Sequence, residues 1–169
     1  MPERRVVVNW VSIKYDGLFN LNELYLMIEN WFRQKGYDWL ELKNYEQSLK
    51  TGKDIEIDLW PYKKISDYHK LNLRVYFLVK EMKDVSVKKD GTDIGMNQGT
   101  LHIRFKGYMD TDYDDRWGGK PFMFFLRHIF DNIIYAFLTK KSAGILSEDI
   151  EHLSSYVKNY LNMSKKPFY

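Results

Sequence analysis

Apolar and polar residues alternate along several short stretches of the chain, and this period of two is typical of β-strands that bury one face. The clearest stretch is Asp54–Leu59, in which three aliphatic residues alternate with three acids. Residues 71–79 and 100–106 alternate in the same way, the latter with Leu101, Ile103 and Phe105 inward. A sheet covered on both faces would instead give continuous apolar runs. We therefore expect an antiparallel sheet with one face on a core and the other toward water or a partner.

Further segments extend this predicted sheet. Residues 5–15 are rich in Val, Ile and Trp, residues 37–49 alternate moderately, and residues 85–87 form a short strand. Asp90-Gly91 is a hairpin signal between the last two strands. In total we expect five to seven strands.

Apolar residues spaced by three and four predict the helices. Asn20 and Glu23 form a capping box before a helix over Leu21–Lys35, and Gly36 follows where a terminating glycine belongs. The strongest apolar stripe follows Pro121, a residue favoured in the first turn of a helix. This stripe predicts a long helix over Pro121–Leu138, which we expect to be the helix gripped by the sheet.

The predicted fold class is α+β: a curled antiparallel sheet of five to seven strands packed on the long helix Pro121–Leu138. One N-terminal helix and one extra C-terminal helix, over Ile150–Leu161, accompany it. The chain length fits one domain. We expect that domain to span residues 1–161 and residues 162–169 to form a flexible tail.

The order of elements over residues 5–138 resembles the helix-grip arrangement of START-like domains that bind lipids and small ligands. The extra helix over Ile150–Leu161 departs from that arrangement. The resemblance implies a sheet that curls round its helix and can leave a cavity for an apolar ligand; the alternative is that large side chains fill this space. The residues near such a cavity would be Trp10, Phe77, Phe105, Phe125 and Ile129.

The composition limits the kinds of catalytic, metal-binding and disulfide sites that the chain can form. The chain has 169 residues, 17% aromatic residues and no cysteine, which excludes disulfides, thiolate nucleophiles and cysteine metal sites. No histidine lies in a metal-binding pattern and no nucleophile or phosphate-loop motif occurs, so we expect no metal and no cofactor. Two enzymatic alternatives stay open: an acid–base role for His128 in a cavity, and a glycosidase-like carboxylate pair formed by Glu56 and Asp58. No apolar segment is long enough to span a bilayer and no secretory leader is recognised, so a cytoplasmic location is expected.

An acidic and aromatic stretch precedes the predicted long helix. Its first residues, Asp110, Asp112 and Asp114, have the spacing that opens a calcium loop, but the glycine and glutamate such a loop needs are missing. The stretch is either a solvated loop or a loop that docks a protein partner. Residues 113–131 also resemble small uncharacterised archaeal proteins, which implies an archaeal, cytoplasmic setting and says nothing about activity. The candidate partner-binding residues are Asp112, Asp114, Asp115, Arg116 and Trp117.

Positive charge is concentrated in the middle of the chain. The net charge of the chain is +3, whereas residues 63–106 hold ten Lys and Arg against five Asp and Glu. These cations are either a solvated sheet face or a face that binds an acidic partner. Tyr76 and Tyr108 lie among them and offer surfaces on which bases can stack. The candidate nucleic-acid-binding residues are Arg74, Lys80, Lys88, Arg104 and Lys106.

Two hypotheses of function follow. The first is a non-enzymatic binding module that holds an apolar small ligand in the cavity between helix and sheet, or a protein partner on the acidic loop. The second is a factor associated with RNA or the ribosome through the basic sheet face. The sequence leaves the oligomeric state open.

Overall fold

The computed structural model describes residues 3–89, 91–111 and 136–164. These residues form one antiparallel sheet and two helices. In chain order the elements are β1 (Glu3–Phe19), α1 (Leu21–Gln34), β2 (Glu41–Leu49), β3 (Gly52–Leu59), β4 (Tyr62–Lys64), β5 (His69–Lys89), β6 (Thr92–Thr111) and α3 (Ala136–Ser164).

The six strands are ordered β1-β6-β5-β3-β2, and the short β4 pairs with the beginning of β5 beside β3. All strand pairs are antiparallel, as alternation predicts. Strands β5 and β6 form a long hairpin of 21 and 20 residues. Gly91 has a φ of 79° in the turn between them, which confirms the hairpin signal at Asp90-Gly91.

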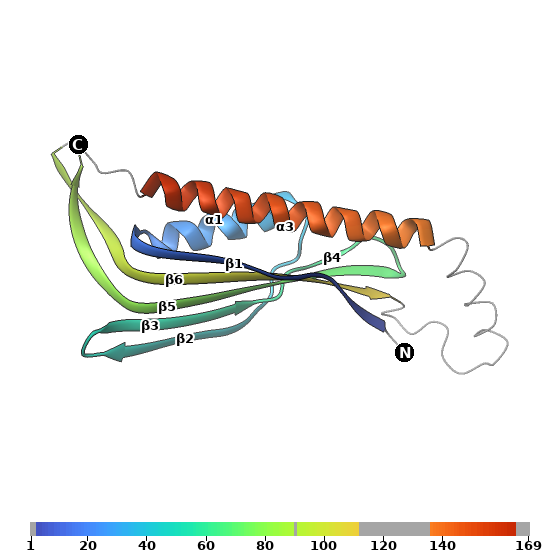
Figure 1. Ribbon diagram of the computed structural model, residues 1–169, viewed down its shortest axis with the longest axis horizontal. Helices are drawn as coiled ribbons and strands as arrows, with labels where there is room; N and C mark the ends of the chain where they lie inside the picture. Colours follow the sequence, from blue (N-terminus) through green and yellow to red (C-terminus); the bar gives the residue numbers. More distant parts are fainter. Residues whose placement is uncertain (1–2, 90, 112–135, 165–169) are drawn as a thin grey trace.

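Both described helices lie on the same side of the sheet (Figure 1). Helix α3 packs against β1, β6, β5 and α1. The predicted inward residues of β6, Leu101, Ile103 and Phe105, are fully buried beneath the helices. A Cβ atom on Gly107 would lie 2.7 Å from the Cδ1 atom of Ile150, so α3 rests directly on the backbone of β6.

The predicted fold class is wrong in its helices. The described residues contain two helices and no extra third helix. The C-terminal helix α3 is continuous from Ala136 to Ser164, whereas the sequence predicted one helix ending at Leu138 and another over Ile150–Leu161. Helix α3 covers the sheet with Leu146, Ile150, Leu153, Val157 and Leu161, so the stripe expected on a peripheral helix forms the core. Most of the expected gripping helix, residues 121–135, lies outside the described residues.

The ends of α1 follow from local chemistry. The side-chain oxygen of Asn20 accepts a hydrogen bond from the Glu23 backbone N–H (3.1 Å), as in a capping box. Gly36 follows the helix with a φ of 74°, a conformation that glycine adopts at little cost. Between these ends, Leu24, Ile28 and Phe32 lie on one helical stripe and are fully buried.

The β5–β6 hairpin bends sharply partway along its length. Its pairing shifts between Lys80 and Lys83, and Glu81 has a positive φ of 52°. Backbone crowds this point: a Cβ on Gly52 would lie 2.7 Å from the Glu81 carbonyl carbon, and one on Gly99 would lie 2.9 Å from the Lys80 oxygen. Beyond the bend the hairpin curves toward the side on which the helices lie (Figure 1).

Candidate functional site

The sheet face opposite α1 and α3 carries a layer of arginine, lysine and aromatic side chains. Alternate residues of β5 and β6 build it, because Arg74 pairs with Lys106 and Tyr76 pairs with Arg104 across the two strands. Strand β1 and the end of β3 add the remaining members. We call this set the open-face cluster: Arg4, Trp10, Trp60, Arg74, Tyr76, Arg104, Lys106 and Tyr108.

Two arginines lie over aromatic rings at the centre of the cluster. The guanidinium carbon of Arg74 is 5.0 Å from the Trp60 ring centre and 5.5 Å from that of Trp10. The guanidinium carbon of Arg104 is 4.7 Å from the Tyr76 ring and 4.9 Å from the Trp10 ring. Distances below about 6 Å give favourable cation–π contacts. Trp10 therefore joins two cations that come from different strands.

A second aromatic pair flanks this centre. The rings of Trp60 and Tyr108 stack with centroids 5.7 Å apart and planes at 11°. The guanidinium carbon of Arg4 is 5.6 Å from the Tyr108 ring, and the Lys106 ammonium nitrogen is 5.2 Å from the same ring. The aromatic rings and cationic groups of the cluster thus form one continuous layer on this face of the β-sheet.

Carboxylates neutralise two of the cluster's arginines. Arg74 donates two hydrogen bonds to Asp58, of 2.9 and 2.6 Å, and Arg4 donates two to Asp110, of 2.7 and 2.8 Å. Bidentate pairs of this kind fix the guanidinium planes. The hydrogen bonds raise the pKa of both arginines, which therefore stay charged.

Arg104 and Lys106 form no ion pair with any residue that the structure describes. The Nε atom of Arg104 is buried without a hydrogen-bond partner among those residues, and so is the Nε1 atom of Trp60. Next to Arg104 on the same strand face, His102 has a lowered pKa because burial and the charges of Lys14 and Arg104 disfavour its protonated form. The centre of the cluster therefore carries positive charge that no carboxylate of the described residues matches.

The structure brings three of the five predicted nucleic-acid-binding residues together. Arg74, Arg104 and Lys106 belong to the open-face cluster. Lys80 lies farther along β5 and pairs with Asp54 at 2.7 Å. Lys88 is exposed near the tip of the β5–β6 hairpin, beyond its bend.

Sequence reasoning missed Arg4 and Trp60 and assigned Trp10 to a different site. A signal for Trp60 was present, because the alternation of Asp54–Leu59 continues to place it on the acidic, outward face. Trp10 follows an irregularity in the pairing of β1 with β6, which hides its direction from a period-two pattern.

The predicted apolar-ligand residues do not come together in the described part of the chain. Phe77 and Phe105 are fully buried on the helix side, whereas Trp10 lies on the opposite sheet face. A side chain with no exposed surface touches no space that a water molecule could occupy. Phe125 and Ile129 lie outside the described residues, as do the candidate partner-binding residues Asp112, Asp114, Asp115, Arg116 and Trp117.

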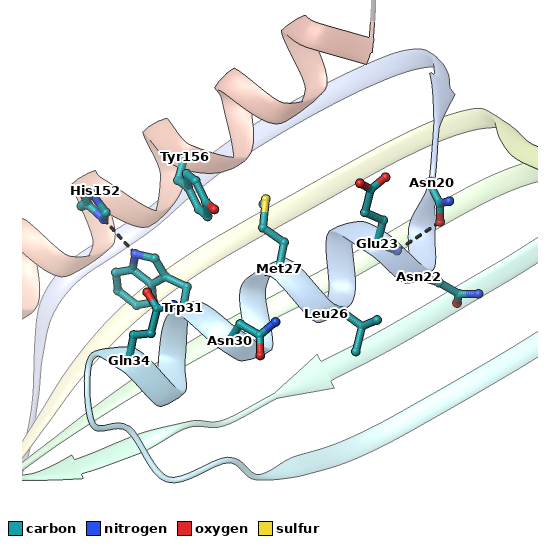
Figure 2. Close-up of a pocket in the computed structure, with 10 residues that line it drawn as sticks. All are labelled: Asn20, Asn22, Glu23, Leu26, Met27, Asn30, Trp31, Gln34, His152 and Tyr156. Atoms are coloured by element: carbon teal, nitrogen blue, oxygen red, sulfur yellow. Dashed lines mark hydrogen bonds between the residues drawn. The ribbon is translucent and has the colours of Figure 1, made fainter. Parts of the chain in front are cut away.

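A groove between α1 and α3 is a second concave region. Trp31 Nε1 donates a hydrogen bond to His152 Nδ1 (2.8 Å) across its floor, and the His152 ring stacks with Tyr156. Figure 2 shows Glu23 and Met27 pointing from α1 toward α3, whereas Leu26 points away. The lining residues are Asn20, Asn22, Glu23, Leu26, Met27, Asn30, Trp31, Gln34, His152 and Tyr156.

The two regions differ in the chemistry they offer. The groove is lined by four neutral amides, one carboxylate, one histidine and four apolar or aromatic side chains, and none of the described residues that line it is an arginine or a lysine. The open-face cluster combines unmatched positive charge with flat rings, which suits a ligand that carries both negative charge and planar groups. Among the described residues no group of three or more His, Asp or Glu side chains is placed to hold a metal ion.

No family model matches the chain, and no curated protein is similar to it in sequence. None of the described helices is both long and apolar enough to cross a membrane.

Proposed function

We propose that the protein binds single-stranded nucleic acid, RNA in the first instance, on the open face of its sheet. The observation that carries this proposal is the position of Arg104 and Lys106: both lie among aromatic rings, and neither is paired with a described carboxylate. Phosphate groups supply the missing negative charge. Release of their counterions makes such binding favourable and dependent on salt.

The aromatic residues favour a single strand over a duplex. Trp10 and Tyr108 stand on a sheet surface, where a ring can stack only on a base that is unpaired and turned toward it. Stacking of this kind contributes about 1–3 kcal/mol per base and tolerates different sequences.

The antiparallel sheet packed on a C-terminal helix is compatible with a helix-grip arrangement, but the cavity function that this resemblance implies has no support from Phe77 and Phe105, which are fully buried. Cytoplasmic location and a protein partner on residues 112–117 remain predictions. The open face is the better basis for a function because its charge and its rings are both on the surface that the helices leave bare.

Fluorescence anisotropy with a labelled oligouridylate tests the proposal. We expect the logarithm of the binding constant to fall linearly with the logarithm of the salt concentration between about 50 and 300 mM. The double variant Arg104→Glu/Lys106→Glu should bind at least about tenfold more weakly, because it replaces two phosphate contacts with repulsion. Trp10→Ala should weaken binding through lost stacking and leave the salt slope unchanged.

A matched control separates the site from the general charge of the protein. Lys141→Glu/Lys158→Glu makes the same change in net charge on exposed positions of α3, on the other side of the molecule. We expect this variant to bind like the unmodified protein. Equal weakening in both double variants, or binding that does not respond to salt, would show that the open face is not the site.

A further inference from the structure

Within the part of the chain that the structure describes, strand β2 is an unpaired edge of the sheet. It pairs with β3 on one side only, and all nine of its residues are exposed. An edge strand presents a row of free N–H and C=O groups to any other strand that approaches it. The opposite edge, β1, differs because α3 packs against it.

The side chains of β2 protect this edge only in part. Leu42, Tyr45 and Leu49 are 59%, 50% and 45% exposed, respectively. Proteins usually guard long edges with charged side chains, prolines, bulges or inward-pointing charges, and of these β2 has the charged residues Glu41, Lys43 and Glu46. The one irregularity in β2 lies between Glu41 and Lys43, and the strand contains no proline. From Lys43 to Leu49 its pairing with β3 is unbroken, which leaves a regular outer row available.

We propose that β2 pairs antiparallel with the β2 of a second copy of this chain, about a two-fold axis at Tyr45. Tyr45 is the midpoint of Glu41–Leu49, so an axis there pairs the whole strand with itself. This proposal is independent of nucleic-acid binding, since it rests on the edge of the sheet and not on its open face.

Avoidance of like charges favours this register. With the axis at Tyr45, Asn44 lies opposite Glu46 of the partner subunit, and its amide can donate to that carboxylate. Lys43 lies opposite Gln47 of the partner subunit, and the two tyrosine rings meet at the axis. An axis at Glu46 would instead oppose two glutamates, and one at Lys43 would oppose two lysines, arrangements that destabilise strand pairing.

The symmetry also fixes how the two sheets join. A two-fold axis perpendicular to the sheet keeps each face of one copy on the same side as the corresponding face of the other. The two open faces therefore form one continuous surface, and both pairs of helices lie on the other side.

Measurement of the mass in solution tests the association. Light scattering after size-exclusion chromatography at tens of micromolar, roughly the range in which weak dimers form, should give twice the chain mass of 20.4 kDa. Tyr45→Lys places two positive charges together at the axis and should return the single-chain mass. Tyr156→Lys is the matched control, an exposed tyrosine on α3 that should leave the dimer intact. A monomeric unmodified protein, or a Tyr45→Lys variant as dimeric as that protein, would overturn the proposal.

A disulfide cross-link tests the register, because the chain has no native cysteine to interfere. In the Tyr45→Cys variant the two new cysteines would face each other at Cα separations of about 4.5–5.5 Å, within the range of a disulfide. In the Gln47→Cys variant they would be about 13 Å apart along the strands and could not join. We expect covalent dimers on a non-reducing gel for the first variant only. Cross-linking of Gln47→Cys without Tyr45→Cys, or of neither variant, would refute the register.

Discussion

Phe77 and Tyr76 are neighbours in β5, yet their surroundings differ completely. Phe77 is fully buried beneath the helices, whereas Tyr76 lies half-buried on the open face against Arg104. The pKa of Tyr76 is raised by burial and by its hydrogen bond to Glu56. The same contrast holds in β6 between Phe105 and Arg104. One strand thus provides two surfaces, and only the side chains that alternate along it distinguish them.

This contrast shows how stability and binding are divided within the sheet. Full burial of a phenylalanine contributes about 1.5–3 kcal/mol from the removal of apolar surface from water. An exposed cation–π contact contributes only about 0.5–1 kcal/mol. The helix-covered face therefore supplies most of the folding free energy of the sheet. The open face keeps its charged groups and rings in contact with solvent and contributes little to stability. Substitutions on the helix-covered face should therefore lower stability strongly, whereas substitutions on the open face should lower it only slightly.

The largest effect is expected for Phe77→Ala. Removal of a fully buried ring leaves a cavity in the core and should lower the free energy of unfolding by about 3–5 kcal/mol. Urea denaturation followed by circular dichroism measures this loss. The matched change on the open face, Tyr76→Ala, should cost about 1 kcal/mol or less and should weaken oligouridylate binding instead. Similar losses of stability in the two variants would contradict the division between the faces.

An intermediate effect is expected for Asp58→Ala. The change leaves Arg74 without the two hydrogen bonds it donates to this carboxylate, and it should lower stability by about 1–3 kcal/mol, since Asp58 is buried and both bonds are charge-assisted. It also adds one positive charge to the open face, so RNA affinity should rise. Denaturation and anisotropy of one preparation measure both quantities. Asp16→Ala, at an exposed position near the end of β1, provides a control with the same change in net charge. A fall in RNA affinity for Asp58→Ala would argue against phosphate binding near Arg74.

The smallest effect concerns pH. The pKa of His102 is lowered in the folded state by burial and by Lys14 and Arg104, whereas in the unfolded chain it lies near about 6.5. The unfolded chain then binds more protons in this range, so stability should decline as pH falls through about 6.5 and should stop declining below the folded-state pKa. Urea midpoints between about pH 7.5 and pH 5 measure the trend. His102→Gln should flatten it slightly, and a variant with the full slope would exclude His102 as its source.

Much of the sheet was predictable from alternation. The inward residues Leu71, Leu73, Val75, Phe77 and Val79 are all fully buried, because a strand with one wet face shows its orientation in its sequence. The full length of β5 was not predictable. The irregularity between Lys80 and Lys83 breaks the period of two, so one bent strand reads as two short ones.

The identity of the helix that covers the sheet could not be predicted from the sequence, for a different reason. The apolar stripe of residues 121–138 contains more large apolar residues than that of Ile150–Leu161, and the sequence therefore predicts that the first of the two helices is the central one. A stripe shows that a helix packs against something but does not identify the partner. The open-face cluster shows a similar limit, because Arg4, Trp60 and Tyr108 meet only once the strand order is known.

The bend at Glu81 lies close to the start of α1. Asn97 pairs with Asp84 just beyond the bend and with Phe19 at the end of β1, and its side-chain oxygen accepts a hydrogen bond from the Leu21 backbone N–H (2.9 Å). The hairpin thus contacts the first turn of α1 through this hydrogen bond. A side chain at Gly52 or Gly99 would collide with the backbone of Lys80, Glu81 or Met82, so we expect such a substitution to disturb the bend on which the position of Asn97 depends.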